Sequence, residues 1–140
     1  MKLPIFQIDA FSDKVFGGNP ACIVPLEKWL EDNILLKIAQ ENAVAKTAFF
    51  VKEGKNFNLR WFTPDIEMDL CGHATLASAR ILFDYYSDLV GEEINLHSKS
   101  GVLKITQVEG GLCLNFPSDQ PAAIELDPLF FEILGIQPLM

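Results

Sequence analysis

Basic side chains are scarce in this sequence, and those present are not clustered. Lysine and arginine number 11 against 19 aspartate and glutamate residues, so the 140-residue chain has a formal charge of 11 − 19 = −8. Binding to nucleic acids or to anionic membranes normally requires a concentrated basic surface. The composition therefore argues against both classes of partner.

Long apolar runs and cysteine pairs are also missing. The longest apolar runs, at residues 21–26 and 43–51, are far shorter than the roughly 20 residues that span a bilayer, and Lys46 interrupts the second. An acid, Asp9, precedes any apolar signal segment, so we expect no signal peptide. The three cysteines lack CxxC spacing, which indicates reduced thiols in a cytoplasmic protein.

The content of apolar residues, in contrast, is high enough for a folded domain. The chain is 49% hydrophobic and 21% charged, which is typical of globular proteins. Residues 117–121 form a polar segment bounded by prolines, and the short helix expected after it has nothing to pack against. We therefore expect one lobe at residues 1–117, with residues 118–140 forming a linker and the start of a second lobe that this chain lacks.

The apolar patterns predict an α+β fold in which a curved, mostly antiparallel or mixed sheet wraps around a central buried helix. That helix has no charge between Leu70 and Ala79 and is rich in small residues, which is typical of a buried helix. Strands are expected at residues 6–10, 21–26, 47–51, 57–62, 94–97, 101–108 and 112–116, and helices at residues 30–42, 71–86 and 128–134.

The first turn of the central helix has the chemistry of an anion site. Its backbone N–H groups lack partners within the helix and carry partial positive charge, which favours a carboxylate at Gly72 to Ala74. Gly72 would let a ligand approach the main chain. His73, with an ordinary pKa of about 6.5, could then transfer a proton beside that carboxylate. The alternative is that His73 only caps the helix.

Cys71 is a second candidate, because a thiol at a helix N-terminus has a lowered pKa and can act as a base or nucleophile. The alternative is a small buried cysteine in the core. Cys22 and Cys113 lie within apolar strand patterns, so we expect both in the core. His97 is expected to be an exposed strand residue.

Asn19, in the glycine-rich turn at residues 17–20, offers an amide to a ligand. The alternative is a turn residue that merely tolerates left-handed backbone geometry. Three acids alternate nearby but have no ligand spacing toward a histidine, so we expect a solvated loop rather than a metal site at Asp65, Glu67 and Asp69.

Four motifs occur in register along the chain: FGGNPA at residues 16–21, AQENAVAKTAFF at 39–50, RWFTP at 60–64 with Glu67, and CGHATL at 71–76. Together they resemble the PhzF-like isomerases of phenazine biosynthesis, which share the diaminopimelate epimerase-like fold. The resemblance implies a longer protein made of two similar lobes, each a sheet curled around a helix, with the active site between them.

The resemblance also implies the chemistry. PhzF-like proteins are cofactor-independent, metal-free biosynthetic isomerases that move a proton between carbons of a small carboxylate-bearing metabolite, and a homodimer is expected. The family's catalytic histidine matches His73, and its substrate loop matches Gly18 and Asn19. Substrate contacts are further expected from Gly72 and Ala74. Cys71 matches the cysteine of related epimerases, which leaves a cysteine-based amino-acid racemase as an alternative.

Two departures from the family concern the catalytic residues. Lys46 stands where the family has its catalytic glutamate, and a protonated lysine accepts no proton unless burial lowers its pKa strongly. The alternative is that Lys46 is a solvated strand end. The aspartate and serine of the family's second lobe are also missing. Two hypotheses follow: an isomerase represented by its N-terminal half, inactive alone, or a non-catalytic lobe that binds a small anion or self-associates.

Overall fold

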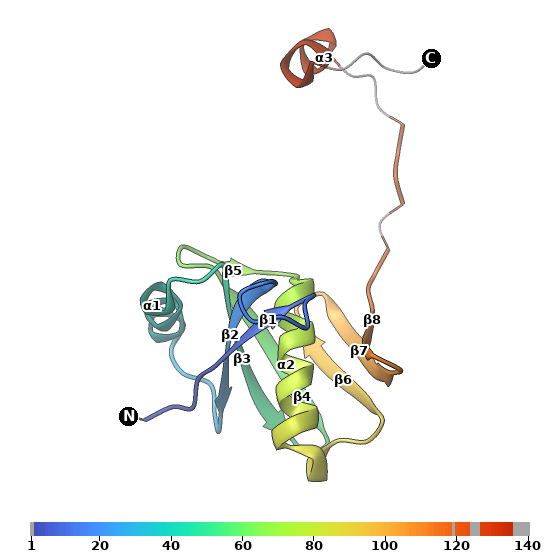
Figure 1. Cartoon of the computed structure of the whole chain (residues 1–140). Helices are drawn as coiled ribbons and strands as arrows, with labels where there is room; N and C mark the ends of the chain where they lie inside the picture. The colour runs from blue at the N-terminus through green and yellow to red at the C-terminus, as the bar shows by residue number, and fades with distance from the viewer. Residues whose placement is uncertain (1, 119, 124–126, 136–140) are drawn as a thin grey trace.

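The protein forms one curled, mixed sheet around a central helix (Figure 1). The computed structural model describes residues 2–118, 120–123 and 127–135. The strands lie in the order β1-β2-β3-β4-β6-β7-β8, with β5 paired to β4; the pairs β2–β3 and β4–β6 are parallel and the others antiparallel. The strands are β1 (Phe6–Ala10), β2 (Asn19–Leu26), β3 (Lys46–Glu53), β4 (Asn56–Phe62), β5 (Glu67–Met68), β6 (Glu93–Ser98), β7 (Gly101–Val108) and β8 (Gly111–Asn115).

The central helix α2 (Gly72–Tyr85) packs on the inner face of the sheet. Its alanines from Ala74 to Ala79 and its apolar residues Ile81 and Leu82 are at most 1% exposed. The hydroxyl of Ser78 donates to the Ala74 carbonyl at 2.7 Å, which satisfies a polar group that would otherwise be buried without a partner. Small side chains let the strands approach the helix closely, as the charge-free sequence predicted.

A second core lies on the outer face, beneath α1 (Asp32–Asn42). Alternation along β3 explains the two cores, because successive side chains of a strand point to opposite faces. Ala48 and Phe50 join the core around α2, whereas Phe49 and Val51 join the core beneath α1. The remaining helical elements are the 3₁₀ turn η1 (Ser87–Leu89) and α3 (Pro128–Leu134), and α3 lies apart from the sheet in Figure 1.

Most of the expected elements are present, and the α+β fold is confirmed. The parallel pairing of β4 with β6 had no local signature, because the two strands are separated by α2 in the sequence. The placements of Cys113 and His97 were wrong. Cys113 is exposed, since its neighbours Leu112 and Leu114 take the inward positions of β8, and His97 is half-buried. Cys22 is buried, as expected.

The prediction of a linker and the start of a second lobe at residues 118–140 concerns residues of which only some are described by the structure. Residues 119, 124–126 and 136–140 are not among the described residues. Residues 117, 118 and 120–123 have neither helix nor strand assigned, and α3 ends at Gly135 with φ 62°. In the described part of the chain, no helix is long and apolar enough to cross a membrane.

Glu67 belongs to an ion network and not to the solvated loop that we expected. Its carboxylate accepts bidentate hydrogen bonds from Arg60 at 2.7 and 2.9 Å and a third from Lys99 Nζ at 2.7 Å. Arg60 also contacts Asp32 at 2.9 Å and lies over the ring of Trp29. These hydrogen bonds, led by those of Arg60 and opposed by burial, lower the pKa of Glu67 to about 2. The network ties β5 and α1 to β4.

Acid should therefore weaken the fold through Glu67. The ionised carboxylate stabilises the native state above its unfolded pKa of 4.5, and this contribution is lost as the pH falls toward about 2. Allowing for solvent screening of the exposed partners, we expect Glu67→Gln to cost about 1–2 kcal/mol at pH 7. Urea unfolding of Glu67→Gln and of Glu53→Gln, an exposed carboxylate, measures this. Equal stabilities of the two variants at pH 7 would contradict the prediction.

Candidate functional site

Strands β2 and β3 place Asn19 and Lys46 at one end of the inner face of the sheet. Ala21, opposite Lys46 in the parallel ladder, and Ala48 both belong to the core around α2. Asn19 and Lys46 precede them by two residues, and residues two apart on a strand share a face. Asn19 is exposed and Lys46 is half-buried. The positive charge of Lys46 is the second cause, after burial, that lowers the pKa of His73 at the start of α2.

His73 has the features of a neutral proton acceptor or donor. Its Nδ1 lies 3.5 Å from the Cys71 sulfur. Its Nε2 is buried and has no hydrogen-bond partner among the described residues, which is costly for a polar atom. Burial, with the positive charge of Lys46 as a second cause, lowers the pKa of His73 from its ordinary 6.5. The imidazole is therefore uncharged at neutral pH.

Of the two alternatives for Cys71, the structure agrees with a small buried cysteine and not with a reactive thiolate. It lies in extended conformation just before α2 and is 6% exposed. Burial raises the pKa of its thiol, and the smaller opposing effects of the Ala74 backbone and of Lys46 do not reverse this. A helix N-terminus lowers a thiol pKa where the sulfur remains solvated. Here desolvation dominates, so Cys71 stays a thiol at neutral pH.

Lys46 carries an unpaired charge in the described part of the chain. No aspartate or glutamate oxygen there lies within 4.0 Å of its ammonium group. The neighbouring Thr47 is buried and accepts a hydrogen bond from the Asn42 amide at 3.1 Å, which anchors the start of β3. The strand thus presents a cation whose charge acts on the His73 imidazole.

Gly72 is approached by protein, whereas we expected a ligand there. A Cβ atom at Gly72 would lie 2.8 Å from the ring of Phe116, which directly follows β8. Ala74 is fully buried, so its side chain presents no surface to a ligand. Phe116 had not been predicted as a neighbour of this site, since a lone aromatic residue at a strand end carries no local signal of a contact made far away in sequence.

The glycine-rich turn packs closely against the backbone of β1. A Cβ at Gly18 would lie 2.4 Å from the Ala10 carbonyl oxygen, so a side chain at this position collides with β1. The Phe16 N–H donates to the Asp9 carboxylate at 2.8 Å, and Phe16 has a positive φ of 64°. Non-glycine residues rarely adopt this conformation, and it concentrates at functional sites. The turn therefore holds Asn19 in place through a strained backbone at Phe16, which the Asp9 side chain supports by its hydrogen bond.

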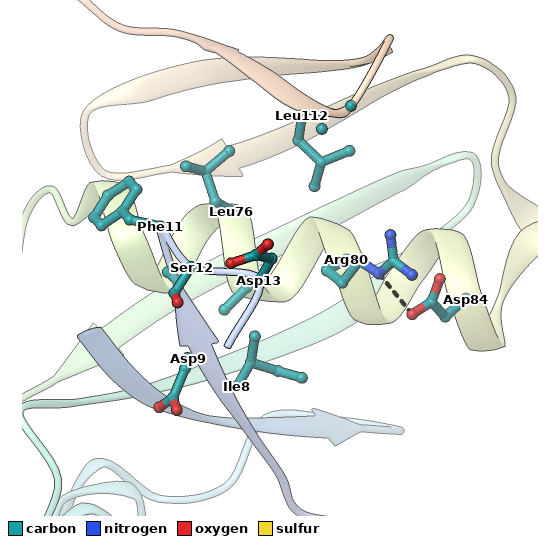
Figure 2. A pocket seen from close by; sticks show the side chains of 13 residues that line it. Ile8, Asp9, Phe11, Ser12, Asp13, Leu76, Arg80, Asp84 and Leu112 are labelled. Carbon is teal, nitrogen blue, oxygen red and sulfur yellow. Dashed lines mark hydrogen bonds and ion pairs between the residues drawn. The ribbon is translucent and has the colours of Figure 1, made fainter. Parts of the chain in front are cut away.

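A cavity begins one turn of α2 after His73, and Asn19, Lys46, Cys71 and His73 are not among its lining residues (Figure 2). It has a volume of about 620 Å³ and runs between the β1–β2 loop, the β7–β8 turn and one side of α2. Leu76, one turn after His73, begins the helical wall, and the Arg80–Asp84 ion pair at 2.8 Å continues it. The i, i+4 spacing of Arg80 and Asp84 was a signal that sequence reasoning had not used.

The proximity of Lys46 to His73 yields a direct test. We expect Lys46→Met to raise the pKa of His73, because a nearby positive charge disfavours the imidazolium. Titration of the His73 ring resonances by NMR measures the shift. Lys52→Met is the matched control, since Lys52 lies on the same face of β3 at its other end. A His73 pKa that is the same in the two variants would show that Lys46 does not act on the imidazole.

Comparison with known proteins identifies the family. Residues 8–126 match the family model of PhzC-PhzF, phenazine biosynthesis-like protein. An uncharacterized isomerase of Pseudomonas aeruginosa is 42% identical over 139 residues, which cover 99% of this chain and 53% of that protein. The chain spans about half the length of these curated relatives.

Solved structures agree with this assignment. A PhzF-family protein of Enterococcus faecalis superposes with a TM-score of 0.86 at 47% identity, over 96% of this chain and 52% of that one. A hydroxyproline epimerase from Agrobacterium vitis shares the fold alone, with a TM-score of 0.55 at 10% identity over 80% of this chain and 40% of its own. The epimerase-like lobe is thus confirmed, and the chain belongs to the PhzC-PhzF family of phenazine biosynthesis-like proteins.

Proposed function

We propose that this chain is the N-terminal lobe of a PhzF-like isomerase that transfers a proton on a small carboxylate-bearing substrate. The observation that carries the proposal is the neutral His73 imidazole, whose buried Nε2 lacks a partner in the described residues, near the charge of Lys46. Asn19 lies at the same end of the sheet as Lys46 and would bind the carboxylate, whereas Phe116 packs at Gly72 and Ala74 is fully buried.

His73 takes the base role in this proposal. When Nδ1–H donates to the Cys71 sulfur, Nε2 carries a lone pair that would accept a proton from a substrate carbon and later return it, once substrate binding exposes this buried atom. The thiol of Cys71 then orients the ring and does not itself remove the proton, which fits its raised pKa. The same argument disfavours the cysteine-based racemase that the sequence had left open.

Lys46 takes an electrostatic role at the position of the family's glutamate. A protonated lysine cannot accept the proton, but its positive charge stabilises the negative charge that develops on the substrate as the C–H bond breaks. Such stabilisation is strongest in a half-buried site that excludes water. Transfer of a proton needs neither electron transfer nor a metal, so the proposal includes no cofactor.

The arrangement of the whole protein belongs to the same proposal. Residues 1–117 would form the first lobe, and residues 118–140 the linker and start of a second lobe that closes the other side of the cleft. The relatives are about twice as long as this chain, which supports a two-lobed enzyme. The three cysteines are free thiols, which supports a reducing, cytoplasmic location.

Proton exchange with solvent tests this function. The chain, extended by a second lobe of the family, is incubated in deuterated water with a panel of small carboxylates that includes proline and trans-4-hydroxy-L-proline. We expect deuterium to enter at least one substrate carbon, both with Lys46 and with Lys46→Glu. No exchange with either residue would overturn the proposal. Exchange of proline that Cys71→Ser abolishes would establish the racemase instead.

A second candidate function is a non-catalytic lobe that binds a small anion or self-associates. The observation in its favour is the β1–β2 loop, where Phe11, Val15 and Phe16 are 73%, 79% and 95% exposed. Such apolar surface is normally covered by protein. We expect the 140-residue chain to sediment as a dimer at micromolar concentration, and Phe16→Ser to shift it toward monomer. A monomer before substitution would eliminate self-association.

A further inference from the structure

A second cavity lies at the opposite end of α2 from His73. It has a volume of about 530 Å³, within the range of small-molecule sites. Tyr86, the residue that ends α2, lines it together with Phe50 of β3 and Phe57 of β4. The 14 residues of α2 separate the two ends by roughly 20 Å at 1.5 Å per residue. The cavity is therefore distinct from the candidate isomerase site.

Aromatic rings form one wall of this cavity in a fixed arrangement. The ring of Phe50 packs edge to face against Phe57, at 5.9 Å and 83°, and against Tyr86, at 5.9 Å and 84°. Phe50 and Phe57 are nearly completely buried, whereas Tyr86 is half-buried and Leu89 beside it is 43% exposed. A flat aromatic ligand would add a further ring contact of the same kind at the exposed side of Tyr86.

Lysines surround the same cavity. Lys2, Lys28 and Lys52 line it and are exposed, and Glu27 is the one acid among the lining residues, so the lining carries a net charge of 3 − 1 = +2. The chain as a whole carries −8. Lys52 lies two residues after Phe50 and thus on the same strand face, which places an ammonium group next to the aromatic wall. Its charge is complementary to an anion.

We propose that this cavity binds a small aromatic carboxylate, with its ring against Tyr86, which packs on Phe50, and its carboxylate among Lys28 and Lys52. Apolar walls with a few convergent charges are the usual composition of a small-molecule site. The proposal is independent of the isomerase activity, because no residue of the His73 site lines this cavity.

Isothermal titration of the 140-residue chain with 2-naphthoate tests the proposal, with 2-naphthamide as the uncharged probe. We expect 2-naphthoate to bind at least fivefold more tightly at low salt. Lys28→Ser/Lys52→Ser should weaken 2-naphthoate about tenfold and leave 2-naphthamide unchanged, since each exposed charge contributes modestly. Lys37→Ser/Lys104→Ser, which removes two lysines away from the cavity, is the matched control and should change neither affinity.

A second variant tests the position of the site. Leu89→Trp enlarges an exposed side chain of the cavity wall and should weaken both probes at least tenfold, with folding checked by circular dichroism. Equal affinities for the two probes, or equal losses in the two lysine pairs, would overturn the proposal. Binding of 2-naphthoate that survives both Leu89→Trp and Lys28→Ser/Lys52→Ser would place the ligand elsewhere and overturn it as well.

Discussion

Replacing His73 by glutamine is expected to slow substrate proton exchange in the two-lobed enzyme by about 10²- to 10⁴-fold. Glutamine keeps a polar side chain of similar length but has no nitrogen that can take up a proton. The buried Nε2 of His73 has no hydrogen-bond partner in the described part of the chain, and the lowered pKa keeps the imidazole uncharged and able to act as a base. Deuterium incorporation, followed by mass spectrometry, measures the loss.

The control for this experiment is the other histidine. His97 lies on β6, and His97→Gln should leave the exchange rate unchanged. The pH profile gives a second readout: activity should fall only below the ordinary histidine range near 6.5, because burial and Lys46 lower the pKa of His73. Retention of the full rate in His73→Gln would assign the proton transfer to another residue and contradict the mechanism.

Gly18→Ala is expected to destabilise the fold by about 2–3 kcal/mol, the range for a strained backbone. The added Cβ would lie 2.4 Å from the Ala10 carbonyl oxygen and 3.0 Å from Asp9. Both positions belong to β1, so the clash cannot be relieved by moving the end of a flexible side chain. The first ladder pair of the sheet, Ala10 with Asn19, must separate instead. Urea unfolding measures the loss.

Gly91→Ala is the matched control, because a Cβ at Gly91 meets nothing within 4 Å. We expect its stability to stay within about 0.5 kcal/mol of the parent. Since Asn19 directly follows Gly18, the extended Gly18→Ala variant should also lose substrate exchange. Equal stabilities of Gly18→Ala and Gly91→Ala would show that the turn adapts without cost and that the close approach to β1 is not essential.

The fold could be predicted from the sequence wherever the pattern lay within a single helix or strand. The charge-free stretch before Arg80 predicted the buried helix, and alternation predicted most strands. Alternation was less reliable at the edge of the sheet. The apolar composition of the last strand predicted a buried Cys113, but the pleat of that strand directs its side chain outward. Glu67 was misplaced for a different reason. Lys99 lies 32 residues away in the sequence, and Arg60 reaches Glu67 only because β4 pairs with β5; without these partners a carboxylate is expected to be solvated.

For the candidate site, the residue types were evident from sequence and their ionisation was not. The helix start with Cys71 and His73, the turn with Asn19 and the unusual Lys46 all came from motifs. The sequence left open an activated thiol or a small buried cysteine at Cys71. Burial raises the pKa of this thiol, because the desolvation that opposes a thiolate depends on how the sheet closes over the helix.

The sequence by itself therefore determined the family, the α+β class and the set of chemical groups, because these depend on residue type and on short-range periodicity. Tertiary structure decided which of those groups are charged, that Phe116 packs against Gly72, and that an aromatic cavity with lysines around it forms at the far end of α2. Each of these depends on chain segments brought together from distant positions, and no local pattern reports on such contacts.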